Sequence, residues 1–492
     1  MRLFSDDRAD FTRLGKRTID LLADFMNSLP GENVDRVVPG GERALLSNLP
    51  FPEHGMSADD IVTFMEQHVM PWPQPTGHQR SYGWVNSPPM PVSILAESVA
   101  QTMNSALDGY DFSGIFLMVS LGRWLMELAG FPAKNEHGED SMALLFSGGS
   151  AANLNALTTA RYAAAKQDGW NMREEGLQGD HPAMIAYASD QVHSSVQRCM
   201  EQLGLGSDNL RKVPTDDAFR MDVDALKDMI AADRAAGLRP FAVVASAGTT
   251  NTGAIDPLNA IADVCEDTGI WFHVDGAYGG FGGLDPRYGD ACAGIERADT
   301  LTTDPHKWLH VPLDCGALLT RRKSLHREAF SLTPDYLEAG GHDGAPWPYE
   351  YMFQLTYANR ALKTWAALAR MGKSGVRDLI IRCNRLADLL DRCVSEAPDL
   401  QCLSPTSLSV VNFRYVPEGS NLDPAQLDDL NQRISDAVSE SGEAHIPTTR
   451  VKGQISLRAC ILHYDNNEDD VRHLVALVRR LGAEMSSEPG KP

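Results

Sequence analysis

The sequence lacks the segments that mark membrane-spanning or exported proteins. Its longest apolar stretches, such as Met142–Phe146 and Phe241–Ala245, are far too short to cross a bilayer. The N-terminal stretch MRLFSDDRADFTRLGKR carries charges where an export signal needs an apolar segment. We therefore expect no membrane anchor and no export, and we expect a cytoplasmic protein.

Cysteine pairs and an excess of positive charge are also missing. The eight cysteines form no CxxC pair and have no zinc-site spacing, so we expect reduced thiols and no metal site. Lysine and arginine number 44 against 66 aspartates and glutamates, which gives a formal net charge of −22. Proteins that bind nucleic acid or anionic membranes by general electrostatics normally have the opposite sign. We expect neither as a partner.

What the sequence does contain is the composition of a large globular protein, with 492 residues of which 43% are hydrophobic. This length predicts more than one domain. Apolar residues recur at helical spacing from Phe11 to Phe25, and the proline-rich string MPWPQPTGH ends this helical zone. The pattern divides the chain into an N-terminal helical segment, a large domain, a small α/β domain and a disordered tail, at residues 1–78, 79–370, 371–485 and 486–492.

Short apolar runs bounded by Gly, Asp and Pro predict strands in the large domain, separated by helical stretches such as 151–166 and Ser194–Leu203. This alternation is typical of the α/β class, with a mostly parallel central sheet covered by helices on both faces. Ligands of such sheets lie beyond the carboxyl ends of the strands. The predicted strands are residues 143–146, 183–189, 241–246, 271–275 and 315–320, followed in the small domain by strands at 409–415 and 455–461 and a helix over Val471–Leu481.

Two residues at or near predicted strand ends suggest chemistry. In HVDGAYGGF, Asp275 ends a strand, where a partly buried carboxylate needs a cation such as a protonated pyridine nitrogen. Otherwise Asp275 only caps the next turn. In TTDPHKWLHVP, Lys307 lies among few charges, in surroundings that favour the neutral amine needed for a Schiff base. The alternative is a surface lysine whose stem packs on Trp308.

Three further segments offer small or polar groups near strand ends. In SGGSAANLNAL (147–157), two glycines precede a helix whose first N–H groups can bind a phosphate, although the segment can also be a plain turn. His193, in SDQVHSSVQR, is placed to stack on a flat ring and to transfer protons, although most single histidines do neither. Thr249 and Thr250, in SAGTTNTGAIDP, offer hydroxyl groups, unless this segment too is only a turn.

Together these residues match one cofactor. A lysine, a carboxylate and a helix N-terminus are what an aldehyde-bearing pyridine with a phosphate arm requires, and this predicts pyridoxal 5′-phosphate. The order of SDQ-x-HSS, HVDGAY and DPHKW also resembles the group II pyridoxal-phosphate decarboxylases, the aromatic-amino-acid and glutamate decarboxylase-like family. The likeness covers about residues 75 to 465.

The resemblance implies an architecture and a role for each motif residue. The fold would be the aminotransferase-like fold type I, in a homodimer with active sites at the subunit interface. Lys307 would hold the cofactor as a Schiff base, Asp275 would pair with the pyridine nitrogen, and His193 would stack on the ring near the substrate. Arg458 matches a contact to the substrate carboxylate, with a surface ion pair as the alternative. The other cofactor-binding residues would be Ser150, Ala151, Ala152, Thr249, Ala277 and His306.

Two places depart from the family pattern. Aromatic-type relatives carry an asparagine where this chain has Asp304, and a carboxylate there changes the charge near the cofactor. In the family, a mobile loop of the partner subunit carries a tyrosine that protonates the α-carbon, and the matching segment here is 333–353. Tyr349 is the candidate for this role and Tyr351 follows closely, whereas Tyr336 looks structural.

The predicted reaction is decarboxylation of an L-amino acid to its amine and CO₂. An aromatic substrate is favoured, while an acidic or diamino acid stays open. If no tyrosine reaches the site, the same chemistry would meet oxygen and give an aldehyde. A non-catalytic dimeric scaffold is a further alternative, against which the intact Lys307, Asp275 and His193 argue. The aromatic walls of the pocket, unless they belong to the core, would be Trp72, Tyr82, Trp84 and Phe112.

Overall fold

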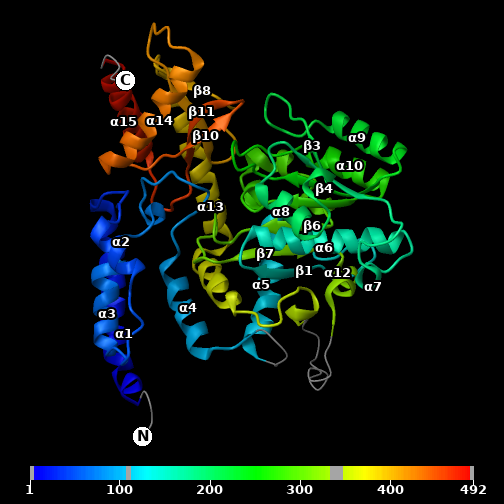
Figure 1. Ribbon diagram of the computed structural model, residues 1–492, viewed down its shortest axis with the longest axis horizontal. Coiled ribbons are helices and arrows are strands. Elements are labelled where there is room, and N and C mark those ends of the chain that lie inside the picture. Colours follow the sequence, from blue (N-terminus) through cyan, green and yellow to red (C-terminus); the bar gives the residue numbers. More distant parts are fainter. Residues whose placement is uncertain (1–4, 107–111, 333–346, 488–492) are drawn as a thin grey trace.

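The computed structural model describes residues 5–106, 112–332 and 347–487, and its larger sheet has seven strands in the order β1-β7-β6-β5-β4-β2-β3 (Figure 1). β7 runs antiparallel to both of its neighbours, and the other pairs are parallel. This confirms the predicted α/β class with a mostly parallel central sheet. The strands are β1 (Met142–Phe146), β2 (Met184–Ser189), β3 (Leu210–Val213), β4 (Arg239–Ser246), β5 (Trp271–Asp275), β6 (Thr300–Thr303) and β7 (Gly316–Thr320).

Helices cover both faces of this sheet because its inner strands are apolar on both sides. Successive residues of β4 point to opposite faces, so Val244 packs in one core with α6 and α8, whereas Val243 packs in another with α5, α9 and α10. The helices of this part are α5 (Ser113–Ala129), α6 (Gly149–Gln167), α7 (Met172–Glu175), α8 (Ser194–Gln202), α9 (Val223–Ala235), α10 (Leu258–Thr268), α11 (Gly289–Cys292) and α12 (Lys323–Phe330).

The carboxyl ends of the parallel strands meet at one edge of the sheet. Ser246 of β4, Asp275 of β5 and Thr302 of β6 are neighbours in the register. β7 runs the other way and therefore begins at this edge, where Gly316 lies opposite Phe146 at the end of β1. The segments that follow β1, β4, β5 and β6 are thus brought together, although they are far apart in sequence.

The smaller sheet has four antiparallel strands in the order β10-β11-β9-β8, and α13, α14 and α15 pack on it through a separate apolar core. α13 is interrupted at Gly372 (φ 65°, ψ 169°), close to the predicted domain boundary at 370/371. The division into domains stays a prediction. These elements are β8 (Leu400–Cys402), β9 (Val410–Tyr415), β10 (Thr448–Val451), β11 (Gln454–Cys460), α13 (Arg360–Glu396), α14 (Pro424–Ser441) and α15 (Glu468–Ser487).

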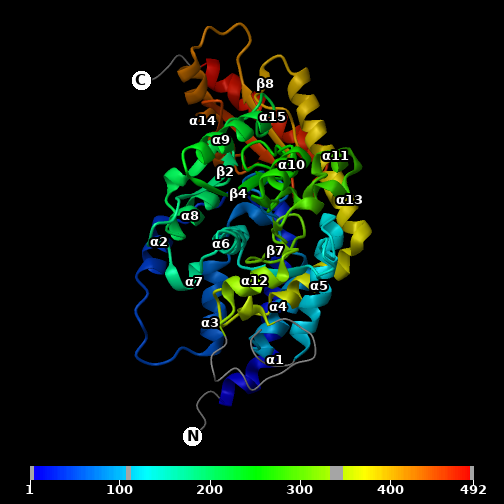
Figure 2. The same ribbon diagram turned by 90° about the vertical axis from the view of Figure 1, so that its right-hand side faces the viewer.

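The predicted tail is partly helical where it is described. α15 includes residues 486 and 487 of that segment, and residues 488–492 lie outside the described part of the chain. In both ribbon views α14 and α15 lie at the opposite end of the molecule from the start of α1 (Figures 1 and 2).

The N-terminal segment is helical, as the spacing of its apolar residues predicts. It contains α1 (Ser5–Ser28), α2 (Gly40–Ser47) and α3 (Ala58–Phe64), which form a column beside the rest of the molecule (Figure 1). α4 (Pro91–Met103) follows and packs against α13. Among the helices that the structure describes, none is both long and apolar enough to cross a membrane.

Candidate active site

A cavity of about 440 Å³ opens at the edge where the parallel strands end. It is lined by the segments that follow β1, β4, β5 and β6, together with residues 84–86 and parts of α6, α8 and β11. We call it the strand-end cavity. The predicted site residues that line it are Ser150, Ala151, His193, Thr249, Asp275, Ala277, His306, Lys307 and Arg458.

Lys307 follows β6 and faces a buried carboxylate. Its Nζ lies 3.1 Å from Asp304 Oδ2, and the Asp304 side chain is only 4% exposed. The hydroxyl of Ser87 donates a hydrogen bond to the Lys307 carbonyl and so holds the backbone. Trp308 is fully buried, so it offers no outer surface on which a lysine stem could pack. Lys307 is therefore a cavity lysine and not the surface lysine of the alternative interpretation.

Asp275 ends β5 and is 8% exposed. One carboxylate oxygen accepts a hydrogen bond of 2.8 Å from Asn153 Nδ2, and the other accepts one of 3.2 Å from the Ala277 N–H. Asp275 thus caps the next turn, as the alternative interpretation holds, and it also lines the cavity.

The first turn of α6 can bind an anion. The N–H groups of Ala151 and Ala152 both donate to the Gly148 carbonyl, so those of Gly149 and Ser150 are left for an outside acceptor. A Cβ on Gly149 would lie 3.1 Å from both Ala277 Cβ and Asp304 Oδ2, so only glycine leaves this space open. Ala152 is fully buried and does not line the cavity, unlike the two residues before it.

Two histidines line the cavity with different protonation constraints. His193 is the residue before α8, and its Nδ1 accepts a hydrogen bond of 3.2 Å from the Ser195 N–H. His306 Nδ1 donates to the Cys315 carbonyl at 2.6 Å. Burial lowers the pKa of His306, so its ring is neutral near pH 7 with the proton on Nδ1. Its Nε2 is then an acceptor.

Thr249 and Arg458 enter the cavity from two different parts of the fold. Thr249 follows β4, is 2% exposed and shares a hydrogen bond of 2.9 Å with Thr252. Arg458 lies on β11 of the smaller sheet, is 7% exposed and donates to the Thr250 carbonyl at 2.9 Å. Its Nε is buried and has no hydrogen-bond partner among the described residues. Arg458 is therefore not a surface ion pair.

The loop tyrosines do not line the strand-end cavity. Tyr349 and Tyr351 are 5% and 4% exposed and belong to the main apolar core. Tyr336 and the rest of residues 333–346 lie outside the described residues. The assignment of a tyrosine as proton donor stays a prediction.

Of the four aromatic residues expected as pocket walls, only Trp84 lines this cavity. It is 54% exposed and has a left-handed backbone conformation with φ 53°. Tyr82 instead lies in the core of the smaller sheet, where its hydroxyl donates to the Asp470 carbonyl at 3.0 Å. For Tyr82, the alternative prediction that the aromatic residue belongs to the core is therefore correct.

Sequence reasoning missed several polar residues of the cavity. Asn153, Ser195 and Ser246 line it, but they are ordinary polar residues of helices or strand ends. The only signal that could have found Asn153 is its position, one turn into the helix that follows the glycine pair.

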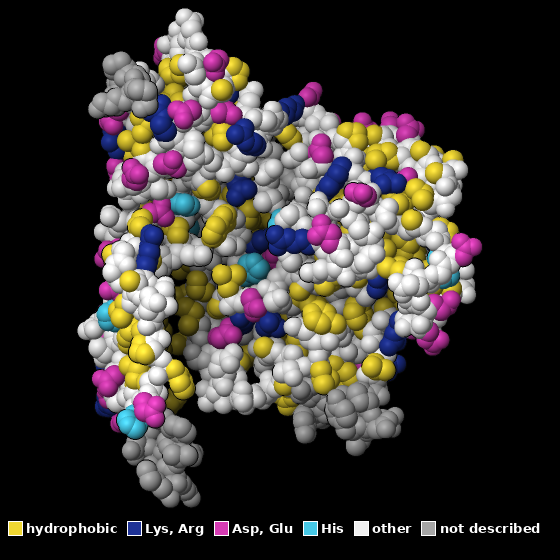
Figure 3. Space-filling model, in the orientation of Figure 1, with side chains coloured by type: hydrophobic (Ala, Val, Ile, Leu, Met, Phe, Trp, Pro, Cys, Tyr) yellow, Lys and Arg dark blue, Asp and Glu magenta, His cyan; other side chains and the backbone are white. Residues whose placement is uncertain are grey.

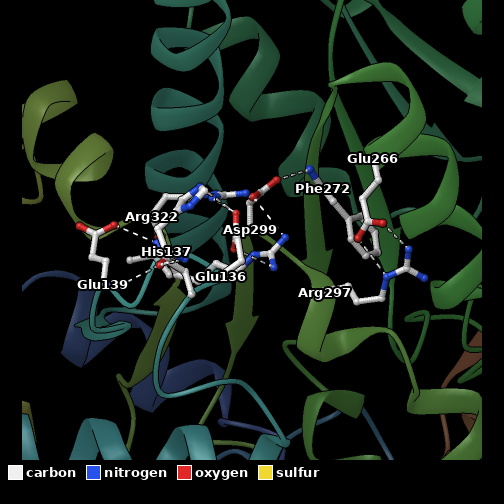
Figure 4. Close-up of polar contacts among 11 residues, drawn as sticks. Glu136, His137, Glu139, Glu266, Phe272, Arg297, Asp299 and Arg322 are labelled. Atoms are coloured by element: carbon white, nitrogen blue, oxygen red, sulfur yellow. Dashed lines mark hydrogen bonds and ion pairs between the residues drawn. The ribbon is translucent and has the colours of Figure 1, made fainter.

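A second cavity, of about 490 Å³, lies at the opposite edge of the sheet, where β5 begins. Its charged side chains pair with one another: Asp299 accepts a hydrogen bond from Arg322, and Arg297 donates to Glu266 (Figure 4). None of the predicted site residues lines it. These ion pairs tie neighbouring elements together and do not form the expected constellation.

A pyridoxal-phosphate enzyme built on an α/β sheet needs three groups around one cavity. These are an amine that can form a Schiff base, a carboxylate, and the N-terminus of a helix. The fold and the strand-end cavity define that class of protein. The conserved domain of pyridoxal-dependent decarboxylases matches residues 39–416, and the chain belongs to this family. It is a carboxy-lyase whose cofactor is pyridoxal 5′-phosphate.

Relatives and solved structures agree with this membership. The chain is 30% identical to the aromatic-L-amino-acid decarboxylase of Bacillus atrophaeus, over 97% of this chain and 96% of the relative. It is 31% identical to the L-2,4-diaminobutyrate decarboxylase of Acinetobacter baumannii, over 82% and 79% of the two chains. The crystal structure of Oryza sativa TDC with PLP and tryptamine superposes with a TM-score of 0.89 at 24% identity and covers 99% of each chain. That likeness supports the aminotransferase-like fold.

The residues present fit this cofactor. Gly149 leaves the first turn of α6 open for a phosphate, and Asp275 offers a buried acceptor for a protonated ring nitrogen. Lys307 provides the amine that such a cofactor needs. Arg458 lines the same cavity and offers a guanidinium to an acidic group of a ligand.

Proposed function

We propose that the protein removes the α-carboxylate of an L-amino acid, aromatic by preference, and releases the amine and CO₂. The observation that carries this proposal is that Lys307 and Asp275 line one cavity together with the first turn of α6. Lys307 would hold the cofactor covalently until a substrate amine replaces it. Asp275 would keep a proton on the ring nitrogen, and the N–H groups of Gly149 and Ser150 would hold the phosphate.

The chemistry divides between cofactor and protein. When bound, the cofactor supplies an electron-withdrawing ring that accepts the electron pair left on the α-carbon as CO₂ departs. The buried carboxylate of Asp275 stabilises the positive charge on that ring. The proton that returns to the α-carbon would come from Tyr349 of the loop, in the partner subunit.

The cavity wall supports the preference for an aromatic substrate. Trp84 offers an exposed aromatic face, with Val85 and Tyr278 nearby in the lining. Arg458 lines the same cavity and would bind an acidic group of the substrate through its guanidinium. The similarity to a diaminobutyrate decarboxylase keeps a diamino or acidic substrate as the alternative.

Product analysis tests the reaction. The holoenzyme is incubated with a panel of aromatic, acidic and diamino acids, and CO₂, amine, aldehyde and peroxide are measured. Amine plus CO₂ from an aromatic acid is the expected result. Aldehyde with ammonia and peroxide would replace the proposal by the oxidative alternative, and no turnover with any acid would contradict both.

Two variants test the residue roles. Lys307→Ala is expected to lose the visible absorption band of the covalently held cofactor, and Asp275→Ala is expected to retain the cofactor poorly and to lose nearly all turnover. Covalent cofactor in the Lys307 variant, found by mass spectrometry after borohydride reduction, would show that another residue holds it.

The protein is also proposed to be a homodimer in the cytoplasm. α4 presents an exposed apolar stripe at helical spacing, formed by Val92, Leu95, Val99 and Met103, and Figure 3 shows hydrophobic side chains along the hollow beside the N-terminal helices. A second copy of the chain would bury this apolar surface in a dimer interface. All eight cysteines are free, which suits a reducing compartment. Sedimentation of the holoenzyme is expected to give a dimer, and a fully active monomer would contradict this.

A further inference from the structure

A chain of buried hydrogen bonds reaches Asp275 from behind the strand-end cavity. Asn153 Nδ2 donates to Asp275 Oδ2 at 2.8 Å, and Asn153 Oδ1 lies 3.0 Å from His273 Nε2. On the other side of this imidazole, Nδ1 lies 2.9 Å from Thr300 Oγ1, which accepts a hydrogen bond of 3.0 Å from Trp271 Nε1. All five side chains are buried, so water does not compete for these contacts.

In each of these hydrogen bonds, the group farther from Asp275 donates to the group nearer to it. Trp271 Nε1 can only donate, so the Thr300 hydroxyl keeps its own proton for His273 Nδ1. Burial holds the pKa of His273 well below its usual value, so the ring is neutral and its one proton lies on Nε2. His273 Nε2–H donates a hydrogen bond to Asn153 Oδ1, so the amide nitrogen of Asn153 faces Asp275. A reversed amide would set its oxygen against the carboxylate.

The second amide proton of Asn153 serves the other predicted catalytic side chain. Asn153 Nδ2 also donates to Ser195 Oγ at 3.1 Å, and Ser195 Oγ lies 2.8 Å from His193 Nδ1. Because the Ser195 N–H also donates to this Nδ1, the nitrogen is an acceptor and the His193 proton lies on Nε2. One amide therefore orients both the acid and the histidine.

We propose that Asn153 is a positioning residue for the reaction: it stabilises the negative charge of Asp275 and, through Ser195, fixes the ring of His193. This rests on the proposed function, because it assigns a task at that same site. Hydrogen bonds in a buried chain strengthen one another, and those to a charged acceptor are the strongest. Loss of the Asn153 amide makes the Asp275 carboxylate a stronger base, so the proton shared with the ring nitrogen moves to the carboxylate.

The test uses two substitutions of equal shape. Asn153→Thr keeps a hydroxyl donor, whereas Asn153→Val does not. Both holoenzymes and the wild type are loaded with pyridoxal 5′-phosphate labelled with ¹⁵N at the ring nitrogen, and the NMR shift of this nitrogen is followed against pH. The titratable or charged groups that line the cavity with Asp275 stay unchanged, namely His193, Tyr278, Asp304, His306, Lys307 and Arg458.

We expect the ¹⁵N shift to report at least a tenfold smaller ratio of protonated to unprotonated ring nitrogen in Asn153→Val than in the wild type, with Asn153→Thr between them. The proton then lies on Asp275, whose carboxylate is the stronger base without this hydrogen-bond donor. kcat is expected to fall at least tenfold in the valine variant, with a smaller change in KM.

Asn155 provides the matched control. It lies on the same helix, is also 1% exposed, and donates to the Tyr351 carbonyl, away from the cavity lining. Asn155→Val is expected to lower stability while the ring nitrogen titrates as in the wild type. This separates loss of positioning from loss of stability.

A second pair of variants keeps the test decisive if Asn153→Val does not fold. Thr300→Val removes the proton donated to His273 and is expected to shift the titration in the same direction, whereas Thr300→Ser retains it. If the ring nitrogen of Asn153→Val titrates as in the wild type, the inference is overturned. If Asn153→Val does not fold, the same result in Thr300→Val overturns it. A wild-type protein that takes up no cofactor would instead overturn the proposed function.

Discussion

Asp275 and Asp304 are both buried carboxylates of the strand-end cavity, and different groups face them. Asp275 accepts from neutral amide groups, whereas Asp304 Oδ2 lies 3.1 Å from Lys307 Nζ and 3.7 Å from His306 Nε2. Asp304 also lies against the first turn of α6, where it would be 3.1 Å from a Cβ at Gly149. Its charge therefore repels an incoming phosphate.

Asp304→Asn is expected to speed the attachment of pyridoxal 5′-phosphate to Lys307 by about tenfold at neutral pH. A negative charge beside the phosphate site opposes binding of the phosphate, and asparagine removes this repulsion; a tenfold faster attachment corresponds to roughly 1.4 kcal/mol. Stopped-flow absorbance of apoprotein mixed with cofactor measures the rate. Asp290 is exposed, so Asp290→Asn serves as control and is expected to behave as the wild type. An unchanged or slower rate in Asp304→Asn would show that the charge of Asp304 does not oppose the phosphate.

The sequence predicts the reactive residues of the site better than the residues that position them. A strand-end acid in HVDGAY and a lysine in DPHKW are unusual, and the structure places both in one cavity. Asn153 and Asn155, by contrast, look alike in NLNAL. Only packing shows that Asn153 faces Asp275, because helix residues two positions apart point in different directions.

Among the elements, the start of β7 packs directly on the glycine turn before α6. A Cβ on Gly316 would lie 2.5 Å from Gly148 Cα and 2.8 Å from Asp304 Oδ1. Gly316→Ala is therefore expected to push this turn away, to weaken cofactor binding at least tenfold, and to lower the free energy of unfolding by about 1–3 kcal/mol. Cofactor titration and urea unfolding measure the two effects. At Gly289 a Cβ meets nothing within 4 Å, so Gly289→Ala is expected to change stability by less than about 0.5 kcal/mol.

At the opposite edge of the sheet, Asp299 ties β5 to the segment that follows β7. It is 8% exposed, and it accepts hydrogen bonds of 2.9 Å from the Phe272 N–H and 2.8 Å from Arg322 Nε (Figure 4). Asp299→Ala leaves both donors without this acceptor and is expected to lower the free energy of unfolding by about 3 kcal/mol. Asp263→Ala removes a 67% exposed partner of Arg297 and is expected to cost less than about 1 kcal/mol. Equal midpoints in urea for the two variants would contradict this difference.

Strands were predictable where their residues are apolar. β5 has the bounds predicted for it, since WFHVD is a buried run that ends in an acid. β6 (Thr300–Thr303) was not predicted, because TLTT between two aspartates reads as a loop. Its threonines are fully buried all the same, since β5 and β7 pair with it on both sides. The short β3, which pairs only with β2, was missed because an edge strand needs no apolar run.

For the whole molecule, buried histidines make stability depend on pH. Burial lowers the pKa of each, to about 4 for four of them, whereas a histidine in the unfolded chain has a pKa near 6.5. Between these values the unfolded chain binds protons that the folded chain does not. The residues are His78, His273, His310 and His326, with pKa values of about 4, and His306 and His463.

The free energy of unfolding is therefore expected to fall as the pH falls below about 6.5, and this loss ends near pH 4, where the folded chain also takes up the protons. Each histidine contributes up to about 1.4 kcal/mol per pH unit. Asp256 opposes them, because burial raises its pKa to about 6 and the folded chain binds that proton first. Urea unfolding at a series of pH values is expected to show a nearly flat profile from pH 7 to 8 and a steep loss between pH 6 and 4.5.

His326→Gln isolates one histidine of this set. The imidazole lies 3.2 Å from Thr159 Oγ1 and 2.6 Å from Asn155 Oδ1, and the amide of glutamine can supply a donor in its place. The variant cannot bind a proton at this position in either state, so its loss of stability between pH 7 and 4.5 is expected to be smaller than that of the wild type by about 2 kcal/mol. An equal loss in both proteins would show that acid unfolds the molecule through other groups, and the carboxylates with lowered pKa, Asp233 and Asp285 among them, would then be the next to test.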